Sequence, residues 1–329
     1  MKRVFLILLL IAYMASSVSA SADEKSKNAP GKAVVQDGKA VMSLPWGSGE
    51  GKVGAANEAG AVCDFMSPTS FYPAAGKIYI LDAPNFRVAR YDVAGKFEAY
   101  YNLEPKVSNE VMLYTDMVVL RDGSAVVSSS REKALYKYDS AGKMIKKTLP
   151  AGVKTIMKIC ATAGGDIVLE DPMSGCFWMT DGEGGVKGTY EIGFQPVVLP
   201  GDRIVKLEFT QEPKPPFKIS AKICDMKSLK EIKSFSFELE KPILSAIAVG
   251  GADESSLLIY SAYGEGGDAP AGAFVIKAGF DGKVIERISA PVSAEFATMR
   301  YIRMESASEV LFAGGGEDGY VLTRHAFKK

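Results

Sequence analysis

The 329-residue chain contains one histidine, His325, which lies close to its C-terminal end. A Ser-His-Asp triad needs an imidazole as its general base, so any such triad would have to use His325. A histidine beside a chain terminus is more often solvated or structural than catalytic. The sequence therefore indicates no catalytic residue and favours a binding protein over an enzyme.

Several polar residues share a spacing that would place them at equivalent positions of a repeat. Thr69, Asp116 and Lys158 each precede a glycine by seven residues. In the less regular later segments the neighbouring polar residues are Gln195, Ser245 and Arg300. One carboxylate among cations and hydroxyls is a poor donor set for calcium, which takes many oxygen ligands. This set suits an anionic or sugar-like ligand better.

The same residues also admit a purely structural interpretation. Asp116 and Lys158 would then form an ion pair across two neighbouring units, because buried charges need partners. The sequence favours this ion pair over a binding site and leaves both open.

Another group of charged residues gathers in the loops between the second and third strands of the units described below. Acids outnumber bases there, and they include Asp82, Asp171, Glu265, Asp268, Glu317 and Asp318. Two of these loops, at residues 208–217 and 263–273, are long, and long loops on a rigid scaffold often carry binding sites. Their proline and glycine content equally fits tolerated insertions. An acidic face of this kind predicts a protein, peptide or cell-envelope partner.

The elements that must position these residues form a repeat. Turns of the type Asp-x-x-Gly-Lys occur at Gly95 and Gly142, 47 residues apart, and a shorter turn follows 42 residues later at Gly184. Glycine accepts the positive φ of a tight hairpin, and aspartate can bond its own backbone. Four short strands at this period are typical of a β-propeller. First strands are expected near Ser67, Thr115, Ile156, Gln195, Leu244 and Met299.

The sixth unit lacks one strand. Its three strands are expected at 300–304, 309–313 and 320–325, while residues 38–44 form a lone apolar strand before the first unit. That lone strand is the natural fourth strand of the last blade, and its pairing there would remove an open sheet edge. The sequence predicts an all-β, six-bladed β-propeller closed by an N-terminal strand, with seven blades or a β-sandwich as alternatives.

The first unit carries the most recognisable residues of the chain. They are Trp46-Gly47-Ser48-Gly49, Pro68, residues 76–82 (GKIYILD) and Asn85-Phe86-Arg87-Val88. This segment resembles an NHL repeat, whereas the later units keep the hydrophobic rhythm without the Asn-x-Arg-Val signature. The family implies a six-bladed propeller that binds proteins, RNA or ligands, with a few enzymatic members.

The resemblance also bears on enzyme activity. The amidoglycolate and streptogramin lyases that share this propeller depend on histidines that this chain lacks. The gluconolactonase-like propellers imply a calcium ion held by oxygens in the central channel. A metal-dependent, lactonase-like hydrolase is therefore the alternative function, and calcium is the one cofactor that it would need.

The N-terminus has the features of an export signal. Lys2 and Arg3 precede an apolar run and small residues, so residues 1–22 are expected to be a secretory signal peptide. Residues 23–38 are expected to be a flexible leader and 39–329 the propeller domain. The protein would be periplasmic or secreted, without stable membrane insertion after cleavage, because no later apolar run is long enough. The balance of 39 basic and 39 acidic residues argues against nucleic acid as a partner.

Four cysteines in an exported chain would permit disulfides. Cys160 is expected on the first strand of its blade and Cys176 on the third, which separates them by a whole strand and favours free thiols. Pairing of Cys63 with Cys224 stays open.

Overall fold

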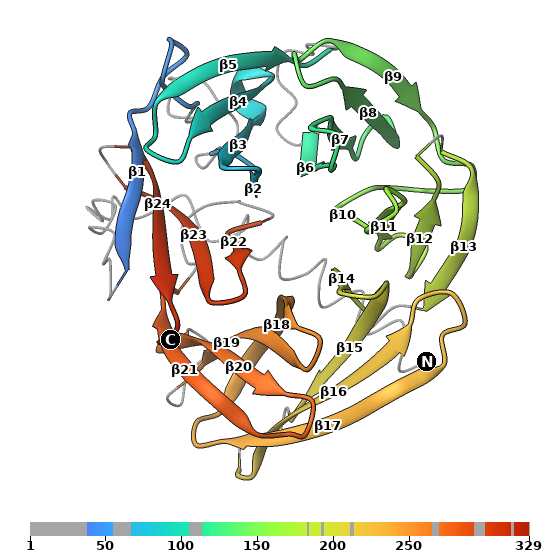
Figure 1. Ribbon diagram of the computed structural model, residues 1–329, viewed down its shortest axis with the longest axis vertical. Helices are drawn as coiled ribbons and strands as arrows, with labels where there is room; N and C mark the ends of the chain where they lie inside the picture. Colours follow the sequence, from blue (N-terminus) through green and yellow to red (C-terminus); the bar gives the residue numbers. More distant parts are fainter. Residues whose placement is uncertain are drawn as a thin grey trace, which may run out of the picture. The chain divides into compact units, whose positions relative to one another are not determined.

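The structure, a computed structural model, is a ring of six four-stranded antiparallel sheets around a central channel (Figure 1). It describes residues 38–54, 67–104, 114–182, 184–191, 194–210, 214–264, 270–292, 300–316 and 319–328. The predicted six-bladed β-propeller is confirmed. Within these residues no helix is long and apolar enough to cross a membrane.

Each of the first three blades is built from four consecutive strands, counted from the channel outward. Blade 1 contains β2 (Ser70–Ala74), β3 (Lys77–Asp82), β4 (Arg87–Asp92) and β5 (Phe97–Asn102), with the short 3-10 helix η1 (Ala83–Asn85) before β4. Blade 2 contains β6 (Tyr114–Val119), β7 (Ala125–Ser129), β8 (Ala134–Tyr138) and β9 (Met144–Thr148). Blade 3 contains β10 (Ile159–Ala161), β11 (Ile167–Asp171), β12 (Cys176–Thr180) and β13 (Val186–Glu191).

The last three blades complete the ring. Blade 4 contains β14 (Phe194–Leu199), β15 (Arg203–Phe209), β16 (Phe217–Asp225) and β17 (Glu231–Leu239). Blade 5 contains β18 (Ile243–Asp253), β19 (Ser256–Tyr263), β20 (Gly272–Gly279) and β21 (Val284–Ala290). Blade 6 contains β22 (Ile302–Ser306), β23 (Glu309–Gly316) and β24 (Gly319–Ala326), with β1 (Lys39–Leu44) as its outer strand.

The ring closes as the sequence predicts. β1 pairs antiparallel with β24, with Leu44 opposite Tyr320, so the N-terminal strand completes the last blade. Trp46 follows β1 and packs edge-to-face on Tyr320 at 6.5 Å between ring centroids. The backbone groups of β24 are thereby paired on both sides, by β23 and by β1.

The hydrophobic core lies between blades rather than within a single layer. Among the described residues it divides into six clusters, and each cluster joins one blade to the next around the ring. One cluster joins Tyr79 and Tyr101 of blade 1 to Tyr114 and Tyr136 of blade 2. Because side chains alternate between the two faces of a strand, each sheet can bury apolar residues on both sides. Blades are consequently stabilised by their neighbours.

The residues that resemble an NHL repeat have a structural role in blade 1. Asp82 is buried and accepts hydrogen bonds from Asn85 Nδ2, Arg87 Nε and the backbone N–H of Gly54, each at 2.8 Å. Arg87 in turn donates to the carbonyl oxygens of Ser48, Gly49 and Lys52. These contacts fasten the segment that follows β1 onto the first blade, next to the closure of the ring.

The cysteines that the structure describes, Cys160, Cys176 and Cys224, are free. Cys160 lies on the first strand of blade 3 and Cys176 on the third, as the sequence predicts. Cys63 lies outside the described residues.

Gly142→Ala and Gly165→Ala separate the strain of a turn from packing between blades. Their φ angles are +86° and +88°, so a side chain strains both backbones alike. A Cβ at residue 142 would lie 2.3 Å from Cδ1 of buried Tyr101 in the preceding blade, whereas nothing lies within 4 Å at residue 165. Since overpacking costs about 1–3 kcal/mol, we expect Gly142→Ala to lower the free energy of unfolding by about that much more than Gly165→Ala. Urea unfolding measures this difference, and equal losses in the two variants would contradict the packing argument.

Candidate functional site

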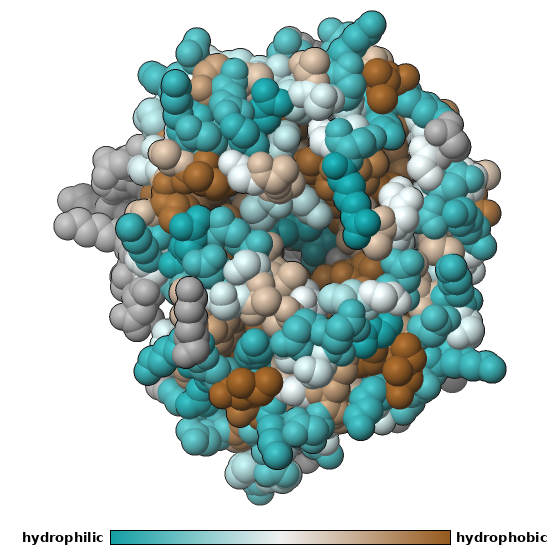
Figure 2. Space-filling model, in the orientation of Figure 1, coloured by the Kyte–Doolittle hydropathy of each residue, from teal (hydrophilic) through white to brown (hydrophobic). Residues whose placement is uncertain are grey.

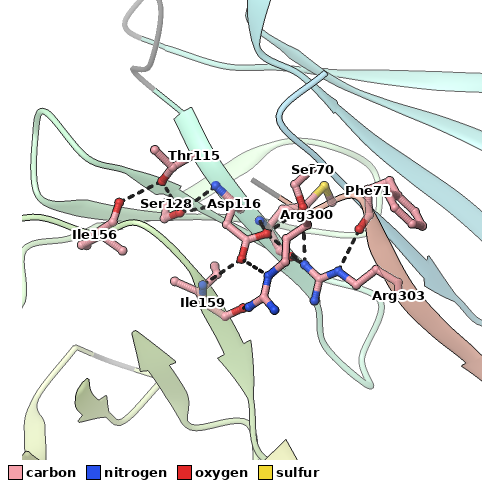
Figure 3. Close-up of polar contacts among 10 residues, drawn as sticks. Ser70, Phe71, Thr115, Asp116, Ser128, Ile156, Ile159, Arg300 and Arg303 are labelled. Carbon is pink, nitrogen blue, oxygen red and sulfur yellow. Dashed lines mark hydrogen bonds and ion pairs between the residues drawn. The ribbon is translucent and has the colours of Figure 1, made fainter. Parts of the chain in front are cut away.

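Asp116, on the inner strand β6, lies at the centre of a polar network beside the channel (Figure 3). Its carboxylate is fully buried. Oδ1 accepts hydrogen bonds from Ser70 Oγ (2.6 Å), the Met117 backbone N–H (2.9 Å) and Arg303 Nη2 (2.9 Å). Oδ2 accepts from the Ile159 backbone N–H (2.9 Å) and Arg300 Nε (2.9 Å). One carboxylate thus links the inner strands of blades 1, 2, 3 and 6.

The two arginines are held by further acceptors. Arg303 donates from Nε to the carbonyl oxygen of Phe71 (3.1 Å) and from Nη2 to that of Met117 (3.0 Å). Its guanidinium lies 4.8 Å from the ring centroid of Tyr72. Arg300 donates from Nη2 to the carbonyl oxygen of Ile159 (3.1 Å). These contacts fix both guanidinium groups at the wall of the channel.

The network controls the ionisation of Asp116. Burial alone would raise the pKa of this carboxyl, but the charges of Arg300 and Arg303, with the Ser70 and Ile159 hydrogen bonds, hold the pKa below its ordinary value. Asp116 is therefore a carboxylate that neutralises part of the arginine charge.

Lys158 precedes β10 and lies in the same channel. Among the residues that the structure describes, its ammonium makes no hydrogen bond or ion pair. Burial lowers the pKa of Lys158, and the charge of Glu170 partly opposes this effect while Arg300 adds to it. An anion beside Lys158 would oppose this effect and favour the charged ammonium, whose hydrogen-bonding capacity the described part of the chain leaves unused.

A cavity of about 240 Å³ opens between the inner strands. Figure 2 shows the molecule hollowed at its centre, with hydrophilic surface inside the hollow. The cationic residues of its wall are Lys158, Arg300 and Arg303. Apolar residues of its wall include Val197 and Val198 from β14, and Ile247 and Val249 from β18. Blades 4 and 5, which carry these four apolar residues, separate the blades that carry the cations (3 and 6) on one side of the ring.

The structure brings together part of the set predicted from spacing. Lys158 and Arg300 line the channel cavity, Asp116 is buried and pairs with Arg300, and Thr69 is buried with its Oγ1 donating to the carbonyl oxygen of Tyr114. Gln195 lies on the inner strand β14, and its side chain is outside the described part. The ion pair expected between Asp116 and Lys158 is wrong, because Asp116 pairs with Arg300 and Arg303 instead.

Sequence reasoning missed Arg303. The predicted sixth inner strand began at Arg300, and residues three apart on a strand point to opposite faces. Strand alternation from Arg300 would therefore place Arg303 on the opposite face, away from the channel. β22 begins only at Ile302, and the long Arg303 side chain reaches Asp116 from there. The only available signal was a second arginine close to Arg300 on an inner strand.

The structure describes only part of the predicted acidic face. Glu265, Asp268, Glu317 and Asp318 lie outside the described residues. Asp82 and Asp171 are fully buried and accept backbone hydrogen bonds, Asp171 from Lys154 and Ser174. These two carboxylates hold loops in place and do not contribute to an exposed acidic surface.

His325 has surroundings typical of a core residue. It is buried on β24, its Nε2 lies 3.2 Å from Thr323 Oγ1, and its ring packs edge-to-face on Phe312. β24 is the third strand of its blade, away from the channel strand β22.

Comparison with known proteins identifies the fold and no family. No family model matches the chain, and no curated protein matches it. Virginiamycin B lyase from Staphylococcus aureus is similar in structure, with a TM-score of 0.52 and 11% identity over 83% of this chain and 97% of that one. A Bacteroides fragilis protein named "Putative exported protein" has a TM-score of 0.51 and 10% identity over 88% of this chain and 99% of that one. At such identities the likeness shows the propeller fold alone.

Asp116→Asn tests whether the network stabilises the fold. The change leaves two buried guanidinium groups without their counter-charge, and breaking a buried pair costs about 3–5 kcal/mol. We expect a loss of that size in the free energy of unfolding, measured in urea. The control is Glu98→Gln, which removes the carboxylate from the exposed cluster with Lys77 and Arg90. Its stability should change little, and equal losses in the two variants would refute a special role for Asp116.

The low pKa of Asp116 also predicts a pH dependence. The folded-state pKa lies below the unfolded value of about 3.9, so the stabilisation by this carboxylate is complete above that pH and is lost as the pH falls through the folded-state pKa. The stability difference between the wild type and Asp116→Asn should therefore shrink as the pH is lowered below about 4. Urea unfolding of both proteins between neutral pH and pH ~3 measures it, and a constant difference would contradict the shifted pKa.

Proposed function

We propose that this chain is a non-catalytic binding propeller whose ligand carries an anionic group into the central channel. The observation that carries the proposal is the wall of Lys158, Arg300 and Arg303 around a cavity of about 240 Å³. Asp116 offsets one of these charges, and its two oxygens are already engaged by both arginines. An entering carboxylate or phosphate would meet the Lys158 ammonium, which burial has already partly desolvated. The low polarity of the site strengthens the attraction between the anion and the ammonium.

The proposal includes the partner predicted from sequence. A peptide or a cell-envelope component can present a carboxylate at the end of its chain. Such an end can enter a narrow channel, whereas a broad protein surface cannot. The acidic face is a weaker candidate for contact with a partner, because two of its carboxylates are buried in the structure.

Export of the protein is part of the same proposal. The basic, apolar and small residues at positions 1–22 support a signal peptide. A binding propeller released from the membrane would meet its ligand outside the cytoplasm.

The alternative of a calcium-dependent, lactonase-like hydrolase fits the channel poorly. A calcium ion needs several free oxygen ligands, whereas both oxygens of Asp116 accept hydrogen bonds from arginine. The described residues contain no group of three or more His, Cys, Asp or Glu side chains that could hold a metal. The two guanidinium groups and Lys158 would also repel a cation from this position.

Lys158→Gln tests the proposal. Calorimetry with acetate, benzoate, citrate and phosphate as probes should detect binding of at least one of these anions to the wild type, which should also raise its melting temperature. Because hydrogen bonds to charged groups contribute about 1.5–3 kcal/mol, Lys158→Gln should weaken that binding tenfold or more.

The matched control is Lys187→Gln, since Lys187 lies on β13 of the same blade and pairs with Asp166 at the surface. Binding to Lys187→Gln should equal that of the wild type. Absence of binding by every probe, or equal weakening in both variants, would refute the channel as an anion site.

A further inference from the structure

The wall of the channel cavity carries its cations and a group of four aliphatic side chains on different blades. The cations come from blades 3 and 6, on either side of blades 1 and 2, and Tyr72 of blade 1 stacks on Arg303. Val197, Val198, Ile247 and Val249 come from blades 4 and 5. Figure 1 places β14 and β18 across the channel from β2 and β6. A ligand bound at the cations therefore has the hydrocarbon side chains of β14 and β18 on the opposite side of the cavity.

These four apolar side chains are only partly buried although they lie at the inner strands. Their unburied surface faces a space that the described part of the protein leaves to solvent. Removing apolar surface from water contributes roughly 25 cal/mol per Å². An occupant with an apolar body would gain this free energy, whereas a sugar or a small inorganic anion would not.

The charge of the site limits the charge of the occupant. Among the described residues, the cations Lys158, Arg300 and Arg303 are opposed by Asp116, which is ion-paired, and by Glu170, which acts on Lys158. Three positive charges against two negative charges leave one positive charge. A monoanion such as a carboxylate neutralises this excess, while a dianionic phosphate would bring a surplus negative charge into a poorly solvated site.

We infer that the channel binds a small amphipathic monocarboxylate, with its carboxylate at Lys158 and the arginines and its hydrocarbon body against β14 and β18. This inference rests on the proposed function and adds the chemical class of the ligand. The cavity lies just below the usual range of ligand pockets, which begins at about 300 Å³. It holds on the order of eight non-hydrogen atoms if each takes roughly the 30 Å³ of a water molecule. A straight-chain acid of about six carbons would fill it.

A chain-length series tests the inference. Calorimetry with acetate, butyrate, hexanoate and octanoate should show binding that tightens about three- to fourfold for each added methylene, because each buried CH₂ contributes about 0.8 kcal/mol. The gain should stop near hexanoate, when the cavity is full. Hexanamide and hexylamine, which lack the negative charge, should bind at least tenfold more weakly than hexanoate, and hexyl phosphate should also bind more weakly.

Two variants separate the two parts of the wall. Ile247→Thr should weaken hexanoate binding several-fold and leave acetate binding unchanged, whereas Lys158→Gln should weaken both by the same factor. Ile285→Thr is the matched control, because Ile285 is exposed on β21 of the same blade as Ile247. Melting curves recorded without ligand establish that each variant is folded.

The possible outcomes distinguish the two proposals. Anion binding without any dependence on chain length, or tighter binding of hexyl phosphate than of hexanoate, would overturn the amphipathic monocarboxylate and leave the anion site standing. Binding of hexylamine as tight as that of hexanoate would overturn both, since the cationic wall would then have no role. Failure of every anion to bind would likewise remove both.

Discussion

The Asp116 carboxylate is the interaction on which the centre of this propeller depends. Hydrogen bonds to it come from Ser70, Met117, Ile159, Arg300 and Arg303, which belong to blades 1, 2, 3 and 6. Removing one partner of a buried ion pair is strongly destabilising. The four inner strands are therefore held at one relative position, because movement of any one of them would leave a charge or a donor unpaired. The same constraint sets the shape and charge of the cavity beside them.

Most of the architecture could be read from the sequence because its signals are local. The turns at Gly95 and Gly142 have the positive φ and the Asp-to-backbone hydrogen bonds that their sequence implies. The lone strand at 38–44 could be assigned to the last blade because a ring leaves only one place for an extra strand. The turns were inferred from adjacent residues and the closing strand from the number of strands in each blade. Neither inference required knowing where a side chain lies.

The site was only partly predictable, for a physical reason. Spacing places Asp116 and Lys158 near the channel, but the choice of ion-pair partner depends on which side chain can reach across the ring. The arginines of blade 6 reach Asp116, and Lys158 of the adjacent blade does not pair with it. Likewise Asp82 looks like a loop acid in sequence, yet it turns inward to accept from Gly54, Asn85 and Arg87. Long-range contacts of this kind leave no periodic trace in the sequence.

The distance along the chain between the network's members has a consequence for how the molecule matures. Asp116 and Arg303 are 187 residues apart, and β1 finds its partner only in β24 at the other end of the chain. Contacts closing such long loops form late, because their entropy cost precedes any gain. Before the last blade is made, Arg300 and Arg303 are missing and the channel wall is incomplete. The Asp116 network and the complete channel wall therefore form only when the last blade has joined the ring.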